Sequence, residues 1–314
     1  MLGVFFVLVV SLLVWWGWAS GAPTNNSSAV GFVIPKGASA SRIAGLLADE
    51  GLIRSEFAFR VYTQVFGKSS KIYAGEHNLA KNLSLPELVG KLFEPPSQVW
   101  VTIPEGLRLE QVAQRVIDGL ELEGVVADKF YSDFLKLTEG KEGYLFPDTY
   151  LFAREVSVEN VVSVMENTFE KKVGEVSRRD VIIASLVEKE TKTEEERPIV
   201  AGIIIKRLEA GWALNIDATV QYAIASDQCL VVGGRCEWWP RITRDDYEYN
   251  SAYNTYKFAG LPPAPIANPG LASVEAVRNY EESPYWYYLH TPDGDVVFSE
   301  TLEEHNSNVD KYLR

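Results

Sequence analysis

The first 35 residues carry no Asp, Glu, Lys or Arg, and this restricts the fold more than any other feature. Residues 2–19 read LGVFFVLVVSLLVWWGWA, roughly 18 apolar or small residues, close to the ~20 that cross a bilayer as a helix. Tryptophans at positions 15, 16 and 18 gather at one end, where an aromatic belt would meet the membrane interface. The sequence therefore predicts a transmembrane anchor over residues 1–19.

A cleaved signal peptide is the alternative, because the small residues Ala19-Ser20-Gly21-Ala22 suit a cleavage site. Against it, the apolar run is longer than a usual signal core, and no basic residue precedes it. We favour the uncleaved anchor. The positive-inside rule gives no orientation for it, because no Lys or Arg precedes the apolar run. Either alternative places the bulk of the chain outside the cytoplasm. With the anchor retained, we expect a single-pass protein of the inner (plasma) membrane whose remaining domains are extracytoplasmic.

Composition and charge exclude some classes of function. A hydrophobic fraction of 46% and a charged fraction of 23% are typical of a globular chain with a core. A net charge of -13 argues against a nucleic-acid partner, because phosphate binding needs a basic surface. No CxxC or HExxH spacing occurs, so we expect neither a metal nor another cofactor. The two cysteines flank a Gly-Gly pair in CLVVGGRC (229–236), which predicts a short hairpin with either a disulfide or two free thiols.

The composition also changes along the chain. Residues 20–30, SGAPTNNSSAV, are small and polar, as in a flexible linker. Residues 31–96 combine an apolar strand, two helical patterns and a capping box ahead of the Pro95-Pro96 break. This β-α-α-β layout is that of a small glycan-recognising module like LysM. Ile34-Pro35-Lys36-Gly37 and Ile103-Pro104-Glu105-Gly106 repeat one strand, turn and helix pattern.

Residues 97–314 form the second predicted domain, which is mostly helical with β accessories. Apolar periodicity predicts helices over 109–119, 157–172, 178–191 and 195–211. The stretch YWYYLH, a Pro-Asp-Gly-Asp turn and VVFSE predict a hairpin over 285–300 before a last helix. We therefore expect an α+β protein.

Two glutamates end the helical stretch VIIASLVEKET (181–191). At about 100° per residue, the apolar stripe centres near ~270°, Glu190 falls at ~280° and Glu188 at ~80°. Glu190 is therefore predicted on the buried face and Glu188 in solvent. Burial raises the pKa of a carboxyl group, as a general acid near neutral pH requires. The alternative is that the helix frays and Glu190 reaches water.

Two further segments offer polar side chains. LNIDATVQYAI (214–224) places Asp217 and Thr219 on one face if it is a strand. Asp217 could instead cap a helix that starts at Ala218, and we favour this alternative. The stretch 251–270 is rich in Pro, Gly and Asn, and such long loops often shape a cleft.

At these residues the chain resembles the MltG-type, YceG-like endolytic murein transglycosylases. The resemblance runs through most of the chain and rests on IPEGLRL (103–109), EGYLFPDTY (142–150), ASLVEKET (184–191), residues 207–222, AYNTYKFAGLPPAPIANPG (252–270) and FSETLEEHN (298–306). The CLVVGGRC segment has no counterpart that we can match to the family. The N-terminal anchor and the LysM-like module also fit the family's order.

The resemblance implies that residues 97–314 are the catalytic domain of a lytic enzyme that cleaves peptidoglycan strands. It also implies action on nascent strands as a terminase, with peptidoglycan synthases as expected partners. The family's catalytic glutamate corresponds to Glu190. It would protonate the oxygen that joins N-acetylmuramic acid to N-acetylglucosamine, and then take the proton of the muramic 6-hydroxyl to leave a 1,6-anhydro end. Membership also implies that a cleft is lined by Asp217, Thr219, Tyr253, Asn254 and Thr255. The competing functions are a lysozyme-like hydrolase and a non-catalytic glycan-binding scaffold.

Overall fold

The computed structural model describes residues 2–66, 72–232 and 236–313. The chain divides into two compact units. The first comprises residues 1–101 with 150–156, and the second comprises residues 102–149 with 157–314. Helices and strands are mixed throughout, which confirms the α+β class. The boundaries predicted at residues 19, 30 and 96 stay predictions.

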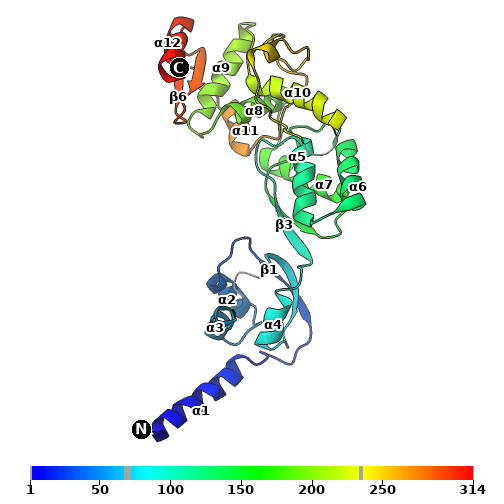
Figure 1. The fold of residues 1–314 in the computed structure, drawn as a ribbon, viewed down its shortest axis with the longest axis vertical. Helices are drawn as coiled ribbons and strands as arrows, with labels where there is room; N and C mark the ends of the chain where they lie inside the picture. The colour runs from blue at the N-terminus through cyan, green and yellow to red at the C-terminus, as the bar shows by residue number, and fades with distance from the viewer. Residues whose placement is uncertain (1, 67–71, 233–235, 314) are drawn as a thin grey trace. The chain divides into compact units, whose positions relative to one another are not determined.

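Helix α1 (Leu2–Ala19) opens the first unit (Figure 1). Its apolar side chains are largely in solvent, with Phe5 and Phe6 both 69% exposed. At its end, Ala19 is buried in the core of the unit, and Trp15 and Trp16 pack against that core. Among the residues described, we find no helix with both the length and the apolar character needed to span a bilayer.

A four-stranded sheet in the order β1-β2-β3-β4 organises the rest of the first unit. Its strands are β1 (Ala29–Ile34), β2 (Gly75–Ala80), β3 (Gln98–Thr102) and β4 (Thr149–Ala153). Between β1 and β2 the chain forms α2 (Ala40–Asp49) and α3 (Glu56–Val65), and α4 (Leu85–Lys91) follows β2. β1 and β2 pair antiparallel, and these elements follow one another in the order β-α-α-β; the likeness to LysM stays a prediction.

The predicted repeat of strand, turn and helix is also present. β1 leads through Gly37 to α2, and β3 leads through Gly106 to α5 (Leu109–Leu120). Gly37 has φ +75° and Gly106 has φ +73°, a left-handed conformation that a Cβ atom would disfavour. The shared Ile-Pro-x-Gly sequence thus produces the same turn twice.

The second unit is mainly helical. Besides α5 it contains α6 (Gly124–Leu137), α7 (Val158–Val173), α8 (Arg178–Glu190), α9 (Arg197–Glu209), α10 (Asp217–Val232), the 3-10 turn η2 (Arg244–Glu248), α11 (Leu271–Arg278) and α12 (Leu302–Tyr312). β5 (Tyr287–His290) and β6 (Val296–Ser299) pair antiparallel as the predicted hairpin, and α12 packs on both strands.

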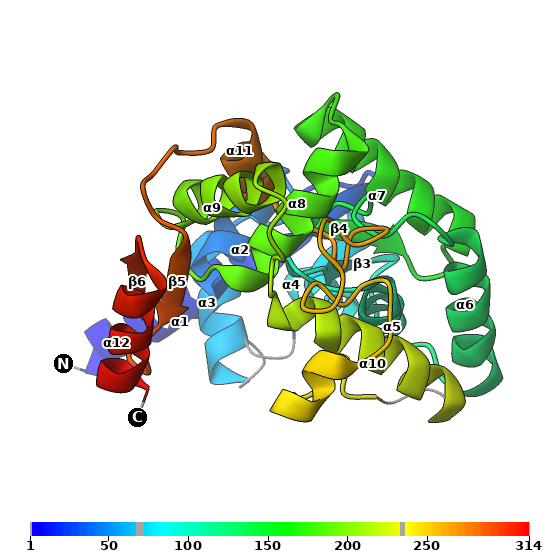
Figure 2. The ribbon, with the colours of Figure 1, turned by 90° about the horizontal axis from the view of Figure 1, so that it is seen from above.

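Helix α8 runs through the middle of this unit, in contact with α9, α10 and α11 (Figure 2). Ser177 caps it by accepting a hydrogen bond from the backbone N–H of Asp180. Every residue from Val181 to Val187 is buried. The helix therefore has no solvent face along these two turns, in contrast to the amphipathic helix that was predicted.

Two open alternatives are decided by the fold. Residues 217–232 are helical, so the strand alternative for Asp217 and Thr219 was wrong. Cys229 and Cys236 form a disulfide, and Cys229 lies in α10 rather than on a hairpin strand. The predicted turn at Gly233-Gly234 lies outside the residues that the structure describes.

Candidate active site

Glu190 is the last residue of α8, because Thr191 leaves the helix with φ -118° and ψ 149°. The Thr191 hydroxyl donates to the carbonyl oxygen of Val187 at 2.7 Å and closes the final turn. This places the Glu190 carboxyl group in a pocket of about 500 Å³. The pocket is also lined by Arg207, Asn215, Asp217, Tyr256, Tyr288, His290 and His305.

Tyr288 on β5 is the direct partner of Glu190. Its hydroxyl donates a hydrogen bond of 2.7 Å to Glu190 Oε2. Burial raises the pKa of Glu190 to about 7, the Tyr288 hydrogen bond lowers it, and the charge of Asp217 raises it again. A carboxyl group with this pKa is about half protonated at neutral pH, so it can both donate and accept a proton.

A second carboxylate lies in the same pocket. Asp217 opens α10, and the hydroxyl of Tyr256 donates a 2.6 Å hydrogen bond to Asp217 Oδ1. This bond and the adjacent charge of the carboxylate raise the pKa of Tyr256, after the larger effect of burial. The pocket therefore contains two carboxylates, and each one is held by a tyrosine hydroxyl.

Arg207 on α9 joins the segments that carry these groups. Its guanidinium donates two hydrogen bonds to the Trp286 carbonyl, 2.9 and 2.6 Å, and one of 2.7 Å to the Leu214 carbonyl. Trp286 leads into β5, and Leu214 lies three residues before Asp217. One side chain thus fixes both Tyr288 and Asp217 relative to Glu190.

Glu188 differs from the sequence prediction, which placed it in solvent. Its Oε2 atom accepts hydrogen bonds from the Gly270 backbone N–H at 3.1 Å and from the Ser273 hydroxyl at 2.6 Å. Gly270 is the N-cap residue of α11, so the carboxylate binds the positive end of that helix dipole. Glu188 is therefore a structural contact between α8 and α11.

Three of the side chains predicted to line the cleft are buried behind it. Thr219, Asn254 and Thr255 are at most 1% exposed. Thr255 Oγ1 accepts the Ile216 N–H at 3.0 Å and lies 3.0 Å from Thr219 Oγ1. Asn254 donates to two backbone carbonyls of its own loop at 2.9 and 2.8 Å. These residues hold the loop against residues 215–219 and offer no surface to a substrate.

Tyr253, also predicted to line the cleft, packs against Tyr222 with ring centroids 4.8 Å apart. Burial raises the pKa of its phenol. Of the predicted set, Glu190 and Asp217 are therefore the two residues that the structure brings into one pocket.

Tyr288, Arg207 and Tyr256 were not predicted as site residues. Tyr288 is 98 residues from Glu190 along the chain, and Tyr256 is 39 residues from Asp217. Their segments had been singled out, as the hairpin YWYYLH and as part of the loop after residue 251, but nothing local links a tyrosine to a distant carboxylate. Over the described parts of the chain, we find no group of three or more His, Cys, Asp or Glu side chains suited to a metal ion.

Comparisons with known proteins agree with this architecture. The model of the YceG-like family matches residues 32–311. An endolytic murein transglycosylase of Bacillus subtilis (strain 168) is 32% identical over 322 residues, covering 92% of this chain and 86% of that protein. An endolytic murein transglycosylase of Streptococcus pneumoniae serotype 2 is 27% identical, covering 92% of this chain and 59% of that protein.

A solved structure shows the same likeness. The crystal structure of a yceG-like protein from Listeria monocytogenes superposes with a TM-score of 0.53 at 29% identity, covering 90% of this chain and 99% of that one. The family match extends over both compact units, and the fold agrees with it. The chain belongs to the YceG-like family.

Proposed function

We propose that this chain is an endolytic murein transglycosylase, which cuts peptidoglycan strands between N-acetylmuramic acid and N-acetylglucosamine and leaves 1,6-anhydro-muramic ends. The observation that carries the proposal is a carboxyl group, Glu190, whose pKa is raised to about 7 in a pocket of about 500 Å³. The names of the curated relatives support the class of reaction.

Glu190 performs both proton transfers in this mechanism. Protonated Glu190 donates its proton to the glycosidic oxygen as the bond from that oxygen to the muramic C1 breaks. The resulting carboxylate accepts the proton of the muramic 6-hydroxyl as O6 bonds to C1. The acid is thereby restored and no water is consumed.

Asp217 contributes charge rather than a proton. Positive charge develops at C1 and the ring oxygen as the glycosidic bond breaks, and a carboxylate in the same pocket stabilises it. Tyr256 holds this carboxylate in place through its 2.6 Å hydrogen bond. A second carboxylate is also what a lysozyme-like hydrolase uses, so hydrolysis is the competing function.

Mass spectrometry of purified murein digested by the wild type and by Glu190→Gln tests the proposal. We expect wild-type products that are one water lighter than hydrolysis products, and a rate at least about 10²-fold lower for Glu190→Gln, since general acid catalysis contributes that much or more. Products with reducing ends would establish the hydrolase instead. Binding without cleavage by the wild type would establish a scaffold.

We also propose that α1 holds the enzyme at the plasma membrane as a single-pass anchor, with the rest of the first unit and the whole second unit outside the cytoplasm. Eighteen residues of helix rise about 27 Å, which is shorter than the ~30 Å hydrocarbon core, so the proposal requires local thinning of the bilayer around α1. The exposed apolar surface of α1 supports this location. Flotation of the full chain with phospholipid vesicles tests it, and an equally buoyant chain lacking residues 1–19 would contradict it.

The proposed membrane attachment and the first unit together suggest which murein strands the enzyme acts on. We propose that residues 31–96 act as a LysM-like module that contacts glycan, because their β-α-α-β order matches that layout. An enzyme held at the membrane would meet nascent strands beside the synthases that make them. Pulse-labelled murein tests this, since cleavage confined to old material would contradict action on nascent strands.

A further inference from the structure

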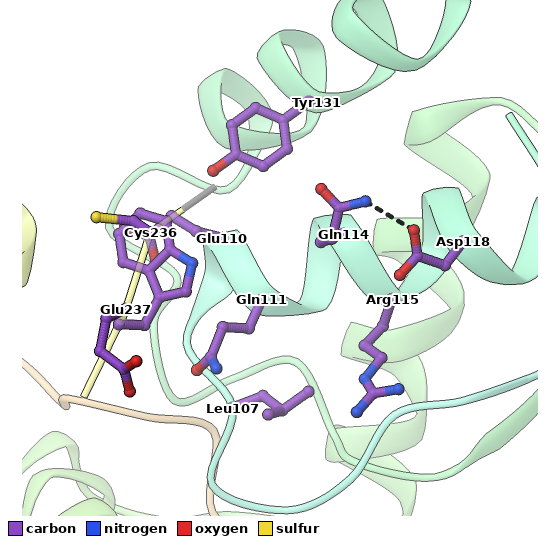
Figure 3. Close-up of a pocket in the computed structure, with 10 residues that line it drawn as sticks. Leu107, Glu110, Gln111, Gln114, Arg115, Asp118, Tyr131, Cys236 and Glu237 are labelled. Carbon is purple, nitrogen blue, oxygen red and sulfur yellow. Dashed lines mark hydrogen bonds between the residues drawn. The ribbon is translucent and has the colours of Figure 1, made fainter. Parts of the chain in front are cut away.

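A second pocket, of about 690 Å³, lies between α5, α6 and the segment after the disulfide (Figure 3). Two aromatic side chains line it, Tyr131 from α6 and Trp238. Polar groups surround them: Gln111, Gln114, Arg115 and Asp118 from α5, and Glu237. Its volume falls in the range of about 300–1,000 Å³ that is typical of ligand sites.

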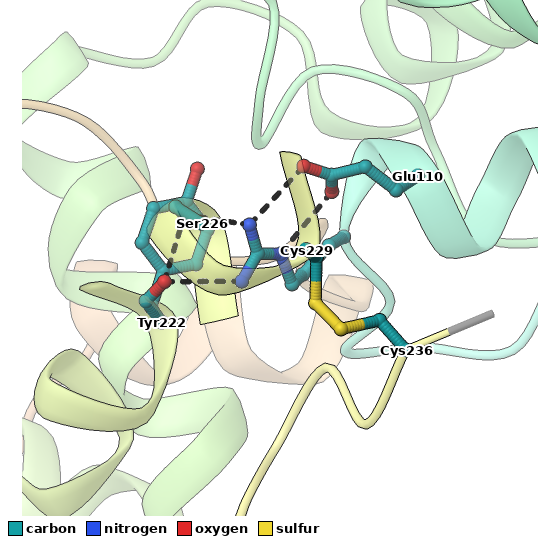
Figure 4. Close-up of a disulfide and its surroundings, with 6 residues drawn as sticks. Glu110, Tyr222, Ser226, Cys229 and Cys236 are labelled. Atoms are coloured by element: carbon teal, nitrogen blue, oxygen red, sulfur yellow. Dashed lines mark hydrogen bonds and ion pairs between the residues drawn. A yellow bond between two sulfur atoms is a disulfide. The ribbon is translucent and has the colours of Figure 1, made fainter. Parts of the chain in front are cut away.

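The side of the pocket that contains Trp238 packs against a buried arginine. Arg108 is 0% exposed, and its guanidinium carbon lies 4.0 Å from the Tyr222 ring centroid and 4.8 Å from that of Trp238. The guanidinium donates to both carboxylate oxygens of Glu110 at 3.1 Å and to the Ser226 hydroxyl at 2.7 Å (Figure 4). A cation fixed on this many sides gives the Trp238 ring a rigid support.

The disulfide and two hydrogen bonds hold the same segment. Cys236, two residues before Trp238, is bound to Cys229 on α10 (Figure 4). Trp239 Nε1 donates to Gln111 Oε1 at 3.0 Å. The Pro240 carbonyl accepts a 2.9 Å hydrogen bond from Gln221 Nε2. The pocket is therefore preformed, which reduces the ordering cost of binding.

The pocket wall is connected to the catalytic helix through Lys189, the neighbour of Glu190. Lys189 Nζ lies 3.8 Å from the Trp239 ring centroid, and Trp239 is the residue bonded to Gln111 of the pocket. An enzyme that cuts within a strand must hold sugars on both sides of the broken bond. A binding site anchored to the helix that carries the acid can meet that need.

The residues that line the pocket indicate the class of ligand that it binds. Aromatic rings present their faces to the C–H face of a pyranose, and amides and carboxylates bind its hydroxyl and N-acetyl groups. Glu110 is neutralised by Arg108, which leaves Asp118 and Glu237 against Arg115. This excess of negative charge opposes anionic polymers and favours a neutral sugar.

We propose that this pocket is a distal subsite for N-acetylated sugar units of the glycan strand, with Trp238 held in place by the Cys229–Cys236 disulfide. The proposal rests on the proposed function, because it assigns the ligand from the same strand. It also gives a role to Cys229 and Cys236, which belong to a stretch that the resemblance left unexplained.

Calorimetric titration of the full-length Glu190→Gln chain in detergent with chitotetraose, a peptide-free N-acetylglucosamine oligomer, tests the subsite. We expect Gln114→Ala and Tyr131→Leu, each made in that chain, to weaken binding roughly three- to tenfold, since each removes about one polar or ring contact. Asn167→Ala is the matched control, because Asn167 also makes one exposed hydrogen bond across a helical turn, to Ser163, as Gln114 does to Asp118.

Kinetics separate this proposal from the proposed function. With Glu190 intact, Gln114→Ala should raise KM for long strands several-fold and leave kcat unchanged. Replacing both cysteines by serine should have the same effect.

Wild-type cleavage with no change in KM or in chitotetraose affinity would overturn the subsite and leave the proposed function standing. No cleavage by the wild type, with weaker chitotetraose binding by Gln114→Ala, would overturn the proposed function and leave the subsite. Binding of a free stem peptide in place of the sugar would also overturn the subsite.

Discussion

At the scale of single residues, the partners of Glu188 and Glu190 distinguish two carboxyl groups that lie two positions apart. Neither is fully exposed. Glu188 accepts hydrogen bonds from the N-terminus of α11, whereas Glu190 has one tyrosine donor and faces a pocket. The first arrangement holds α8 against α11. The second leaves Glu190 able to exchange a proton with a substrate.

The isosteric pair Glu188→Gln and Glu190→Gln tests this difference. Glu190→Gln should lose cleavage and keep its fold, since glutamine retains an acceptor for Tyr288. Glu188→Gln should keep the wild-type rate of murein cleavage. It should lower the free energy of unfolding by about 1 kcal/mol, because a charge is lost at a helix N-terminus. Urea denaturation and murein digestion measure the two effects. An equal loss of kcat in correctly folded Glu188→Gln would refute the assignment.

Tyr288 should act as a positioning residue through its hydrogen bond to Glu190 Oε2. That bond lowers the pKa of Glu190, so Tyr288→Phe should raise the pKa and move the basic limb of the pH–rate profile to higher pH. The loss of one oriented contact should reduce kcat by about tenfold. Tyr285→Phe is the control, because that ring stacks on Phe298 and phenylalanine preserves the stacking. An unshifted basic limb would contradict the role given to Tyr288.

At the scale of elements, the close approach of α9 to the segment before β5 sets the position of the hairpin. The Glu281 N–H donates to the Pro198 carbonyl at 3.0 Å. A Cβ atom added at Gly202 would lie 2.1 Å from the Glu281 backbone oxygen. Backbone, rather than a flexible side chain, occupies that space. The glycine therefore allows the chain that leads to Tyr288 to lie directly on α9.

Gly202→Ala should accordingly lower the free energy of unfolding by about 1–3 kcal/mol, as overpacking does, and should reduce cleavage by displacing β5. Gly45→Ala is the matched control within α2, where an added Cβ meets nothing within 4 Å. That substitution should stabilise its helix by about 0.5–1 kcal/mol. Urea denaturation of both variants measures the contrast, and a neutral Gly202→Ala would contradict the proposed close packing.

At the scale of the whole molecule, two raised carboxyl pKa values make stability depend on pH. Burial raises the pKa of Glu190 to about 7 and that of Glu142 to about 8. Both groups bind protons more tightly in the folded protein than in the unfolded chain. Their contribution is therefore fully present below about pH 4.5, the unfolded value, and is lost as pH rises through the folded values.

Glu190→Gln should consequently be more stable than the wild type at alkaline pH. A shift from about 4.5 to about 7 corresponds to at most about 3 kcal/mol, reached above pH 7 and absent near pH 4. Urea denaturation of both proteins at pH 4, 6 and 8 measures the difference. A gap that does not widen with pH would contradict the raised pKa of Glu190.

The sequence by itself determined the local structure. Ser177 and the aliphatic run after it specify α8, and Gly37 and Gly106 specify two equal turns, because capping and φ preferences act within a few residues. The sequence motifs of the family are also local, and they singled out Glu190. The helical wheel gave the wrong surroundings for Glu188, however, since it assumes one buried face, and α8 is surrounded by α9, α10 and α11.

Only the tertiary structure decided which groups meet at the site. Tyr288, Arg207 and Asp217 reach Glu190 from three segments, and Thr219, Asn254 and Thr255 are buried behind them. The sequence could propose a raised pKa for Glu190, but its value depends on burial and on the charges and donors that the fold brings near. Those distances are set by long-range packing, which no periodicity along the chain encodes.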